Sequence, residues 1–395
     1  MKIVILAVEA VVGWGGSEEL WADTARAALA AGHEVWFTPR VDPRGYEAPL
    51  DELVALGATK LPRRSWTDAD GRVHAEMVPA ELAAIASRAD VLFVSIGSMR
   101  HVLDDSLTSL IQDAGVPVAA TIQLTSETDM LPDALRERAR RVIGLLGALV
   151  VPAHRSLTTL QRILAARVDH GVVIPSPIRR DLTGPVAWPD SAVPTMACVA
   201  RLSPVQKGHD LLLEVLSDPL WKSRRWALNF VGRGRSDRYL AELAAFYGLA
   251  DRLTLTGFQS DMRAVWSQNH MLVLPSREES MPIAIMEAMF CARPCLVTDV
   301  GDNARLITDG VNGYVAEGDR PHALAAALDR AWDGRHGWKT MGQRAFETYT
   351  AQRDPTPGKT VLSLLESMCA TAPSRTGGTE GATRTAGPEV RLRHA

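Results

Sequence analysis

The sequence has few of the features that identify disulfide-stabilised, nucleic-acid-binding or membrane-spanning proteins. Its four cysteines among 395 residues lack the paired C-x-x-C spacing of a metal or disulfide framework, so reduced thiols and a cytoplasmic protein are expected. The formal net charge is only −3, and the ten tryptophans show no regular pattern, which argues against nucleic acid as a partner. No apolar run approaches the roughly 18 residues of a transmembrane helix.

What the sequence does contain is an alternation of short apolar strands and amphipathic helices. The length favours two domains, because one hydrophobic core seldom serves so long a chain. Runs rich in Val, Ile, Leu and Ala, bounded by turn residues, are typical of parallel strands buried on both faces. Such strands are predicted at 2–8, 34–38, 90–95, 117–122, 148–151 and 172–174, and then at 195–200, 227–231, 253–256, 271–274 and 295–298.

A proline-rich stretch separates the two series of strands. Proline breaks both helix and sheet, so residues 179–194 are predicted to be a linker. The two series predict two Rossmann-like α/β domains, 1–178 and 195–350, each a doubly wound parallel sheet. The apolar helix within 351–371 is a candidate to return to the first domain. Residues 372–395 lack periodicity and are expected to be disordered.

Two loops at strand ends have residues suited to a phosphate group. Gly15 and Gly16 precede a helix, whose N-terminus offers free N–H groups, although a tight turn without a ligand is the alternative. The spacing is not G-x-G-x-x-G, which argues against a dinucleotide. Arg201 and Lys207 follow a strand of the second domain, where open α/β sheets bind ligands. Both cations could neutralise a diphosphate, and a solvated basic loop is the alternative.

A single acid stands in the apolar helix that follows the strand at 271–274. Pro282 is expected in the first turn of this helix, where a missing N–H costs nothing. Glu287 is the only charged residue among the helix's apolar neighbours, and a buried carboxylate needs hydrogen-bond donors. The hydroxyls of a ribose are one source of donors. Backbone amides or an arginine are the other.

The segment just before this helix places polar groups at the carboxyl end of the strand. Glu279 is positioned to accept hydrogen bonds from the hydroxyls of a sugar, whereas Glu278 is expected to point to solvent. The amides of Met281 and Ile283 are expected to face phosphates at the helix N-terminus.

These residues resemble the motif of retaining glycosyltransferases of family 4, which have the GT-B fold of two Rossmann-like domains facing across a cleft. Glu279 and Glu287 match the E-x7-E pattern of that family, inside PSREESMPIAIMEAM. The likeness covers roughly residues 1–350. It extends to GGSEELW, VARLSPVQKG, VGRG, LTGFQSD and VGDNARLITDGVNGYV.

The resemblance implies an enzyme that moves a sugar from a nucleoside diphosphate, UDP or GDP, to an acceptor hydroxyl of a glycan, glycolipid or natural product. It implies no metal and no cofactor beyond the nucleotide-sugar donor. Arg201 and Lys207 would hold the diphosphate, Glu279 the transferred sugar and Glu287 the ribose, the first three being catalytic. The remaining donor-site residues that it implies are Gly15, Gly16, Gly232, Phe258, Gln259, Ser280, Met281 and Ile283.

One position departs from the family pattern on the acceptor side. Gln123 stands where relatives often have a histidine, and glutamine can hydrogen-bond a sugar but cannot titrate. His101 and His154 are nearby candidates, with an ordinary surface histidine as the alternative for each. The acceptor itself is not identified by the sequence.

Three alternatives remain open at this point. The chain could be another enzyme of the same fold, such as a nucleotide-sugar epimerase, or a non-catalytic nucleotide-sugar-binding protein. Peripheral contact with the inner face of a membrane is also left open. It would use a basic helix face, which is otherwise solvated, formed by Arg136, Arg138, Arg140 and Arg141.

Overall fold

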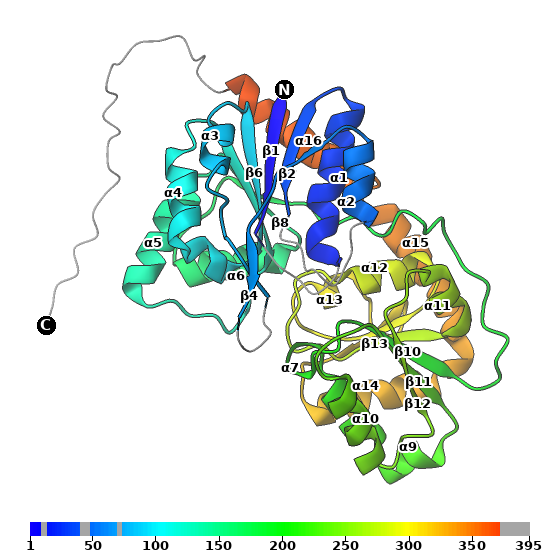
Figure 1. The fold of residues 1–395 in the computed structure, drawn as a ribbon. Helices are drawn as coiled ribbons and strands as arrows, with labels where there is room; N and C mark the ends of the chain where they lie inside the picture. The colour runs from blue at the N-terminus through cyan, green and yellow to red at the C-terminus, as the bar shows by residue number, and fades with distance from the viewer. Residues whose placement is uncertain (9–13, 40–47, 69–72, 372–395) are drawn as a thin grey trace, which may run out of the picture.

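The computed structural model describes residues 1–8, 14–39, 48–68 and 73–371, which form two lobes (Figure 1). The first lobe is built on a seven-stranded parallel sheet in the order β3-β2-β1-β6-β7-β8-β9. Its strands are β1 (Lys2–Ala7), β2 (Glu34–Thr38), β3 (Thr59–Lys60), β6 (Val91–Ser98), β7 (Val118–Leu124), β8 (Ala148–Val151) and β9 (Gly171–Val173), with a separate hairpin of β4 (Ser65–Thr67) and β5 (Val73–Ala75). Its helices are α1 (Gly16–Ala30), α2 (Ala48–Ala55), α3 (Leu82–Ala86), η1 (Met99–Leu103), α4 (Asp105–Asp113), α5 (Asp133–Gly144) and α6 (His154–Leu164).

Alternating side chains of the central strand explain why this sheet is covered on both faces. Ile3 and Ile5 of β1 belong to one apolar cluster, and Val4 and Leu6 belong to another. All four are fully buried. Since successive side chains of a strand point to opposite faces, an uninterrupted apolar run requires helices on both sides.

The second lobe repeats this plan with a six-stranded parallel sheet in the order β12-β11-β10-β13-β14-β15. Its strands are β10 (Thr195–Val199), β11 (Ala227–Val231), β12 (Leu253–Gly257), β13 (Met271–Leu274), β14 (Cys295–Thr298) and β15 (Gly313–Ala316). Its helices are α7 (Pro204–Lys207), α8 (His209–Leu216), α9 (Pro219–Ser223), α10 (Asp237–Phe246), α11 (Met262–Gln268), α12 (Ile283–Phe290), α13 (Asn303–Leu306), α14 (Pro321–Asp333), η2 (Arg335–Gly337) and α15 (Trp338–Gln352).

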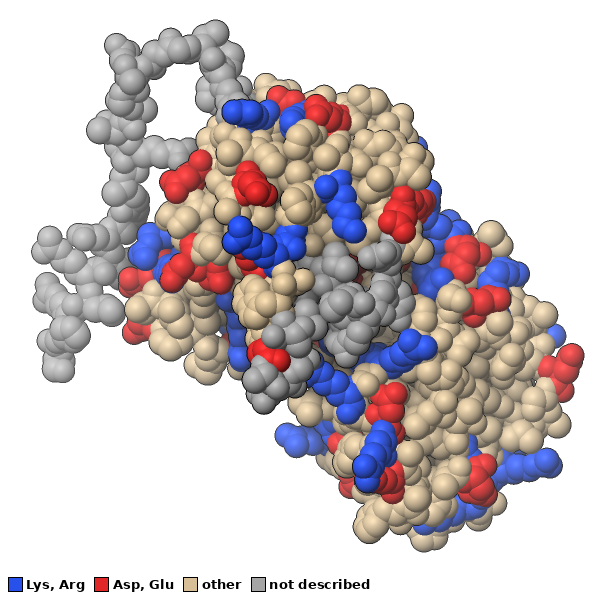
Figure 2. Space-filling model, viewed as in Figure 1, with Lys and Arg blue, Asp and Glu red and all other residues tan. Residues whose placement is uncertain are grey.

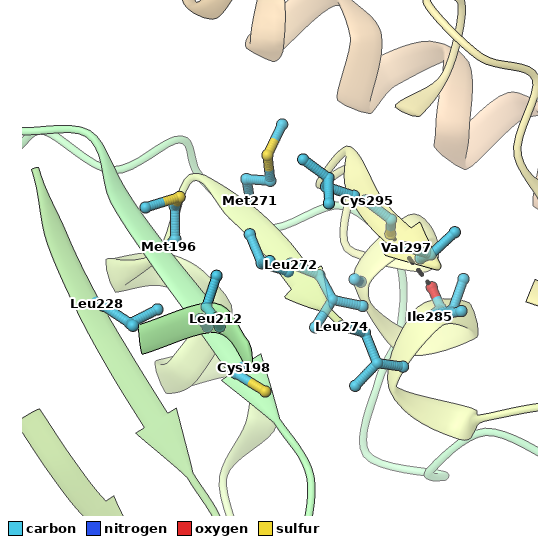
Figure 3. Close-up of a cluster of buried hydrophobic side chains, with 14 of the residues drawn as sticks. Met196, Cys198, Leu212, Leu228, Met271, Leu272, Leu274, Ile285, Cys295 and Val297 are labelled. Carbon is cyan, nitrogen blue, oxygen red and sulfur yellow. Dashed lines mark hydrogen bonds between the residues drawn. The ribbon is translucent and has the colours of Figure 1, made fainter. Parts of the chain in front are cut away.

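The core of the second lobe packs helices on its central strands (Figure 3). Cys198 of β10 and Leu272 of β13 are fully buried, as are Leu212 of α8 and Ile285 of α12. Cys198, Cys291 and Cys295 are buried and free, whereas Cys369 is half-buried and free. The thiols therefore serve as apolar core groups, with Cys369 an exception to full burial.

The strand order reverses once in each sheet, and this reversal marks where ligands bind. In the first sheet β1 lies between β2 and β6, and in the second β10 lies between β11 and β13. Ligands of open α/β sheets bind beyond the carboxyl ends of the strands at such reversals. The two carboxyl edges face each other, because the loop after β14 contacts the N-terminus of α6, which follows β8.

The last described helix, α16 (Pro357–Thr371), lies against the first lobe (Figure 1). The amide of Gly358 donates to Asp23 Oδ2 of α1 at 2.9 Å, and Val361 and Leu365 are fully buried in the first lobe's core. The chain therefore leaves the first lobe, forms the second and comes back. The predicted tail at 372–395 lies outside the described residues.

Three short strand elements were not expected from the sequence, and Pro282 is placed differently. β3, β15 and the β4–β5 hairpin have strands of only two to four residues, too short for an apolar period to stand out. Pro282 was predicted in the first helical turn, but it is the N-cap of α12, with extended backbone at φ −72° and ψ 124°. The helix thus begins one residue later than expected.

The surface carries both signs of charge, interspersed over the face that Figure 2 shows. None of the described helices combines the length and the apolar character needed to cross a membrane.

Candidate functional site

A charged pair lies at the carboxyl edge of the second sheet, where the loops after β10 and β13 meet. Lys207, the last residue of α7, donates from Nζ to Oε1 of Glu279 at 2.7 Å. The hydroxyl of Ser276 donates to the same oxygen at 2.7 Å. The side chains of Lys207 and Glu279 are only 18% and 7% exposed, so the pair is largely withdrawn from water and each group fixes the other.

The glycine that follows Lys207 allows this close approach. Gly208 has a φ of +66°, and a Cβ atom there would lie 1.9 Å from the carbonyl oxygen of Pro275. Any side chain would push the Lys207 loop away from the end of β13. The Lys-Gly sequence is therefore needed for the ion pair to form.

Arg201 lies beside this pair and keeps its charge exposed. Its Nη2 donates to Oε1 of Gln206 at 3.0 Å, and Nε2 of Gln206 donates to Oε2 of Glu278 at 2.9 Å. Glu278 was expected to point to solvent, and the structure shows it half-buried against Gln206. Arg201 is thus oriented by a neutral amide, and no described carboxylate forms an ion pair with it at the sheet edge.

Glu287 is buried in α12, as its apolar neighbours predict, with 4% of the residue exposed. Burial raises its pKa to about 8, and the charge of Arg179 and a backbone hydrogen bond at Arg179 lower that pKa in part. Among the described residues its Oε1 has no hydrogen-bond partner. Arg179 therefore provides part of the stabilisation that a buried carboxylate needs, as the alternative to ribose hydroxyls required. One buried carboxylate oxygen still lacks a donor among the described residues.

The glycine loop of the first lobe reaches the start of α12. A Cβ atom on Gly16 would lie 3.1 Å from Cδ1 of Ile283, so the two lobes are in close contact at this point. Gly15 is the N-cap of α1, and its amide donates to Oε2 of Glu18 at 2.9 Å. Gly16 therefore lies nearer the predicted donor site than Gly15, whose amide already has a partner.

The remaining predicted donor-site residues lie in the loops that follow β11, β12 and β13. Gly232 follows β11, and its amide donates to the carbonyl of Gly257 at 2.9 Å. Phe258 and Gln259 follow β12 and are half-buried, with Gln259 Nε2 donating to the carbonyl of Thr256 at 2.7 Å. The carbonyl of Ser260, the residue after Gln259, accepts a hydrogen bond from Arg179. The charge of Arg179 also lowers the pKa of Glu287.

Ser280 and Met281 lie between Glu279 and α12. Ser280 is 5% exposed, and among the described residues its hydroxyl has no partner. Met281 is half-buried against the core of the second lobe. A buried hydroxyl without a partner next to Glu279 is a group that a bound ligand could satisfy.

The acceptor-side candidates lie at or near the carboxyl ends of strands in the first sheet. Gln123 is in β7, and its Nε2 donates to Thr121 Oγ1 at 3.2 Å. His101 is in η1, directly after the neighbouring strand β6. His154 is exposed at the start of α6, where its amide donates to Asp302 of the second lobe at 2.7 Å. His154 is therefore in contact with the other lobe through its backbone.

Two features bear on metal and membrane binding. The sequence has an Asp-x-Asp pair, Asp68-Ala69-Asp70, in which Asp68 Oδ2 is 2.7 Å from His74 Nε2, while Asp70 lies outside the described residues. Among the described residues no group of three or more His, Cys, Asp or Glu could hold a metal ion.

Most of the predicted basic face of α5 is engaged within the protein. Arg136 pairs with Asp133, Arg138 pairs with Asp105, and Arg140 donates to the carbonyls of Leu164 and Ala165.

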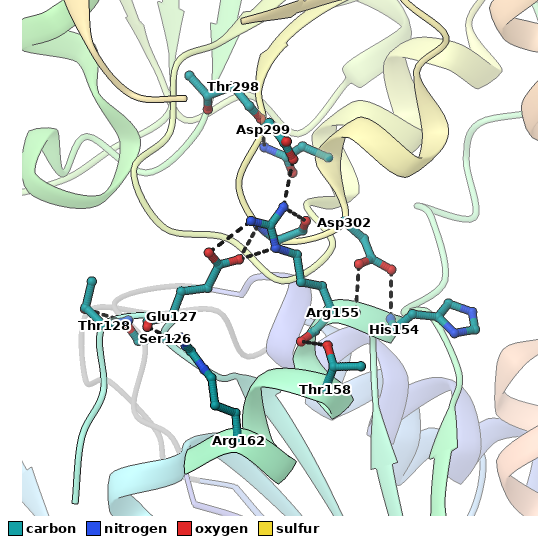
Figure 4. Close-up of polar contacts among 12 residues, drawn as sticks. Ser126, Glu127, Thr128, His154, Arg155, Thr158, Arg162, Thr298, Asp299 and Asp302 are labelled. Atoms are coloured by element: carbon teal, nitrogen blue, oxygen red, sulfur yellow. Dashed lines mark hydrogen bonds and ion pairs between the residues drawn. The ribbon is translucent and has the colours of Figure 1, made fainter. Parts of the chain in front are cut away.

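A polar cluster between the lobes was not found from the sequence (Figure 4). Arg155 of the first lobe contacts Asp299 of the second, and Asp302 accepts hydrogen bonds from α6. Asp302 lies in the motif VGDNARLITDGVNGYV, shortly after the strand predicted at 295–298. The sequence could therefore have placed it at the carboxyl edge of the second sheet. Arg155 had no such signal, because its partners are distant in the chain.

Comparison with known proteins gives a family match in the second lobe and a structural match to the whole fold. Residues 193–333 match the family model described as glycosyl transferases group 1. The chain is 31% identical over 154 residues to alpha-D-kanosaminyltransferase of Streptomyces kanamyceticus, covering 38% of this chain and 40% of that protein. It is 28% identical over 253 residues to D-inositol 3-phosphate glycosyltransferase of Nocardia farcinica, covering 59% of this chain and 52% of that protein. The chain thus spans about half or less of the length of these curated relatives.

Among solved structures, the fold is similar to that of Anabaena HepE in complex with UDP-glucose. The TM-score is 0.70 at 18% sequence identity, over 94% of this chain and 100% of that chain. At this identity the likeness concerns the fold alone. Together with the two parallel sheets, it confirms the predicted architecture of two Rossmann-like domains.

Proposed function

We propose that this chain, whose residues 193–333 match the group 1 glycosyltransferases and which has the GT-B fold, is such an enzyme and transfers a sugar from a nucleoside-diphosphate donor to an acceptor hydroxyl. The observation that carries the proposal is the Lys207–Glu279 pair, 2.7 Å apart, at the carboxyl edge of the second sheet. Arg201 is exposed in the loop after β10, the same loop that leads to Lys207. A cation and an acid held together match a substrate with a diphosphate on one side and sugar hydroxyls on the other.

The proposed mechanism uses these charges at the bond that breaks. The leaving diphosphate gains negative charge in the transition state, and Arg201, Lys207 and the N-terminus of α12 offset it. Because Ser276 and Lys207 hold Glu279, its carboxylate keeps a fixed orientation towards the hydroxyls of the transferred sugar. We further propose that the anomeric configuration is retained, through attack on the face that the diphosphate leaves.

The donor is proposed to be a UDP- or GDP-sugar, and the side chains of this protein are proposed to replace a metal ion as the counter-charge of the diphosphate. The structure of HepE was solved with UDP-glucose, which makes UDP-glucose the first donor to test. The acceptor is proposed to bind on the edge of the first sheet, near Gln123 and His101.

Slow hydrolysis of the donor tests the function without knowledge of the acceptor. The protein is incubated with UDP-, GDP-, ADP- and TDP-sugars, with and without EDTA, and release of the nucleoside diphosphate is measured. We expect release from one class of donor, at the same rate when EDTA is present. Binding without release would indicate a non-catalytic binding protein, interconversion of the sugar would indicate an epimerase, and loss of release with EDTA would contradict the metal-free mechanism.

The buried acid of α12 predicts a pH dependence of donor binding. With a pKa of about 8, Glu287 is protonated at neutral pH in the free protein. If ribose hydroxyls donate to its carboxylate, binding releases this proton, and affinity for UDP-glucose rises from about pH 6 to about pH 8 by at most about tenfold per pH unit. Calorimetry in buffers of different ionisation enthalpy measures both the affinity and the proton released.

The matched variant for this prediction is Glu287→Gln, which has the same shape but cannot ionise. Its affinity should be independent of pH, and no proton should be released.

The raised pKa of Glu287 also determines how the stability of the fold changes with pH. Between the ordinary pKa of 4.5 and about 8 the folded chain holds a proton that the unfolded chain has released, so stability should fall as pH rises through this window. A wild-type affinity that does not change with pH would assign Glu287 a structural role only.

A further inference from the structure

The N-terminus of α6 is capped by a residue of the other lobe. Ala153 occupies the N-cap position and provides no side-chain bond. Instead, the two carboxylate oxygens of Asp302 accept from the amides of His154 and Arg155 at 2.7 and 2.8 Å (Figure 4). Asp302 is 4% exposed, so this contact is buried between the lobes. A carboxylate at a helix N-terminus meets free amides and the positive end of the helix dipole.

Ion pairs surround this cap and link the same two lobes. Arg155 lies between Glu127 of its own lobe, at 2.5 Å, and Asp299 of the second lobe, at 2.7 Å. Its Nη1 also donates to the carbonyl of Gly301 at 3.3 Å. In return, the amide of Gly301 donates to Oε1 of Glu127 at 3.3 Å. Both lobes therefore contribute donors and acceptors to one cluster.

The segment that carries Asp302 is packed on the proposed donor loop. The amide of Asp302 donates to the carbonyl of Ser280 at 2.8 Å. A Cβ atom on Gly301 would lie 2.4 Å from the carbonyl oxygen of Glu279, so the two backbones are in direct contact. Asp302 thus joins the first lobe by its side chain and the Glu279–Ser280 segment by its backbone.

We propose that Asp302 is a positioning residue, which holds the two lobes in the arrangement that transfers the sugar. This rests on the proposed function. The charges assigned to the diphosphate all belong to the second lobe, whereas Gly16 and the acceptor side belong to the first. Donor binding therefore depends mainly on the second lobe, whereas transfer needs both lobes in one fixed arrangement. Asp302 favours the joined state because its carboxylate has these two partners only when the lobes meet.

The test replaces Asp302 with Ala and measures three quantities on the full chain. With UDP-glucose as the probe, we expect the kcat of donor turnover to fall by about tenfold, the size expected when a cap on one side of a two-state equilibrium is lost. Affinity for free UDP should stay within about threefold of the wild type, because the cationic side chains assigned to the diphosphate are unchanged. Small-angle X-ray scattering should show a larger radius of gyration. Asp302→Asn should be intermediate, since one amide oxygen cannot replace both carboxylate oxygens.

A helix cap within one lobe provides the control. Asp218 caps α9, accepting from the amide of Leu220 at 2.8 Å, and both residues belong to the second lobe. Asp218→Ala should lower the melting temperature without changing the scattering or kcat. Scattering and kcat unchanged in Asp302→Ala would overturn the proposal. So would an equal loss of UDP affinity and kcat, which would place the effect inside the second lobe. Absence of any nucleotide-sugar turnover in the wild type would reject the proposed function, while the scattering comparison would still test the contact between the lobes.

Discussion

Replacing Arg201 with Ala is expected to lower donor turnover by about 10²- to 10³-fold, the loss seen when one preorganised group that stabilises transition-state charge is removed. The guanidinium is exposed, and its hydrogen bond in the protein is with the neutral side chain of Gln206 at 3.0 Å. Because no described carboxylate pairs with the guanidinium, its charge is available for the leaving diphosphate. The same exposure means that the fold should tolerate the change. Steady-state turnover and a melting curve measure the two effects separately.

Two variants control for the loss of a positive charge in general. Arg225 is exposed just before β11, at the opposite edge of the same sheet, and Arg225→Ala should leave turnover unchanged. Arg201→Lys keeps the charge but loses the paired donors of the guanidinium, so it should recover only part of the activity. Turnover of Arg201→Ala within a few-fold of the wild type would contradict the role assigned to Arg201.

Replacing Arg293 with Ala is expected to cost on the order of 3–5 kcal/mol of unfolding free energy, because buried carbonyls lose their donor and a cavity is left. Arg293 is 1% exposed, and burial lowers its pKa to about 10. Among the residues that the structure describes, no carboxylate is a hydrogen-bond partner of Arg293. Its partners are main-chain carbonyls from both the second lobe and the interlobe segment, namely Trp266, Asn269, Cys291, Ala292, Val186 and Ala187.

The reason for so large an effect is that four of these partners, Trp266, Asn269, Cys291 and Ala292, are buried. Removing the guanidinium leaves several buried acceptors unpaired, and it also leaves a cavity beside Trp188, whose ring lies 5.1 Å from the guanidinium carbon. Arg293→Lys should lose less than Arg293→Ala, because an ammonium group still provides three donors, although not the five of a guanidinium. Urea unfolding followed by tryptophan fluorescence measures both variants. A loss under about 1 kcal/mol for Arg293→Ala would show that water replaces the guanidinium.

The motif that carried the functional prediction was informative because its chemistry is local. Glu287 was predicted to be buried from the apolar residues around it, and it is 4% exposed. Lys207 and Glu279 are 72 residues apart and yet form a 2.7 Å bond. Their meeting was foreseeable because the carboxyl ends of neighbouring parallel strands share one edge. The roles given to these residues remain predictions.

Other contacts were out of reach because nothing local indicates them. Asp302 and Arg155 are 147 positions apart and belong to different lobes. Arg293 looks in sequence like any surface arginine, and the carbonyls that hold it come from segments up to 107 positions away. Glu278 was predicted to be solvated, and its contact with Gln206 depends on how closely two loops approach.

By itself the sequence determined the two sheets, their parallel strands and the edge where the charged residues gather. These follow from periodicity and from the rule that parallel strands end together, which operate over a few residues at a time. Only the tertiary structure decided how the lobes are joined, through the Asp302 cap on α6 and the return of α16 to α1. Such contacts depend on the relative placement of whole domains, and no short stretch of sequence specifies a distance between two domains.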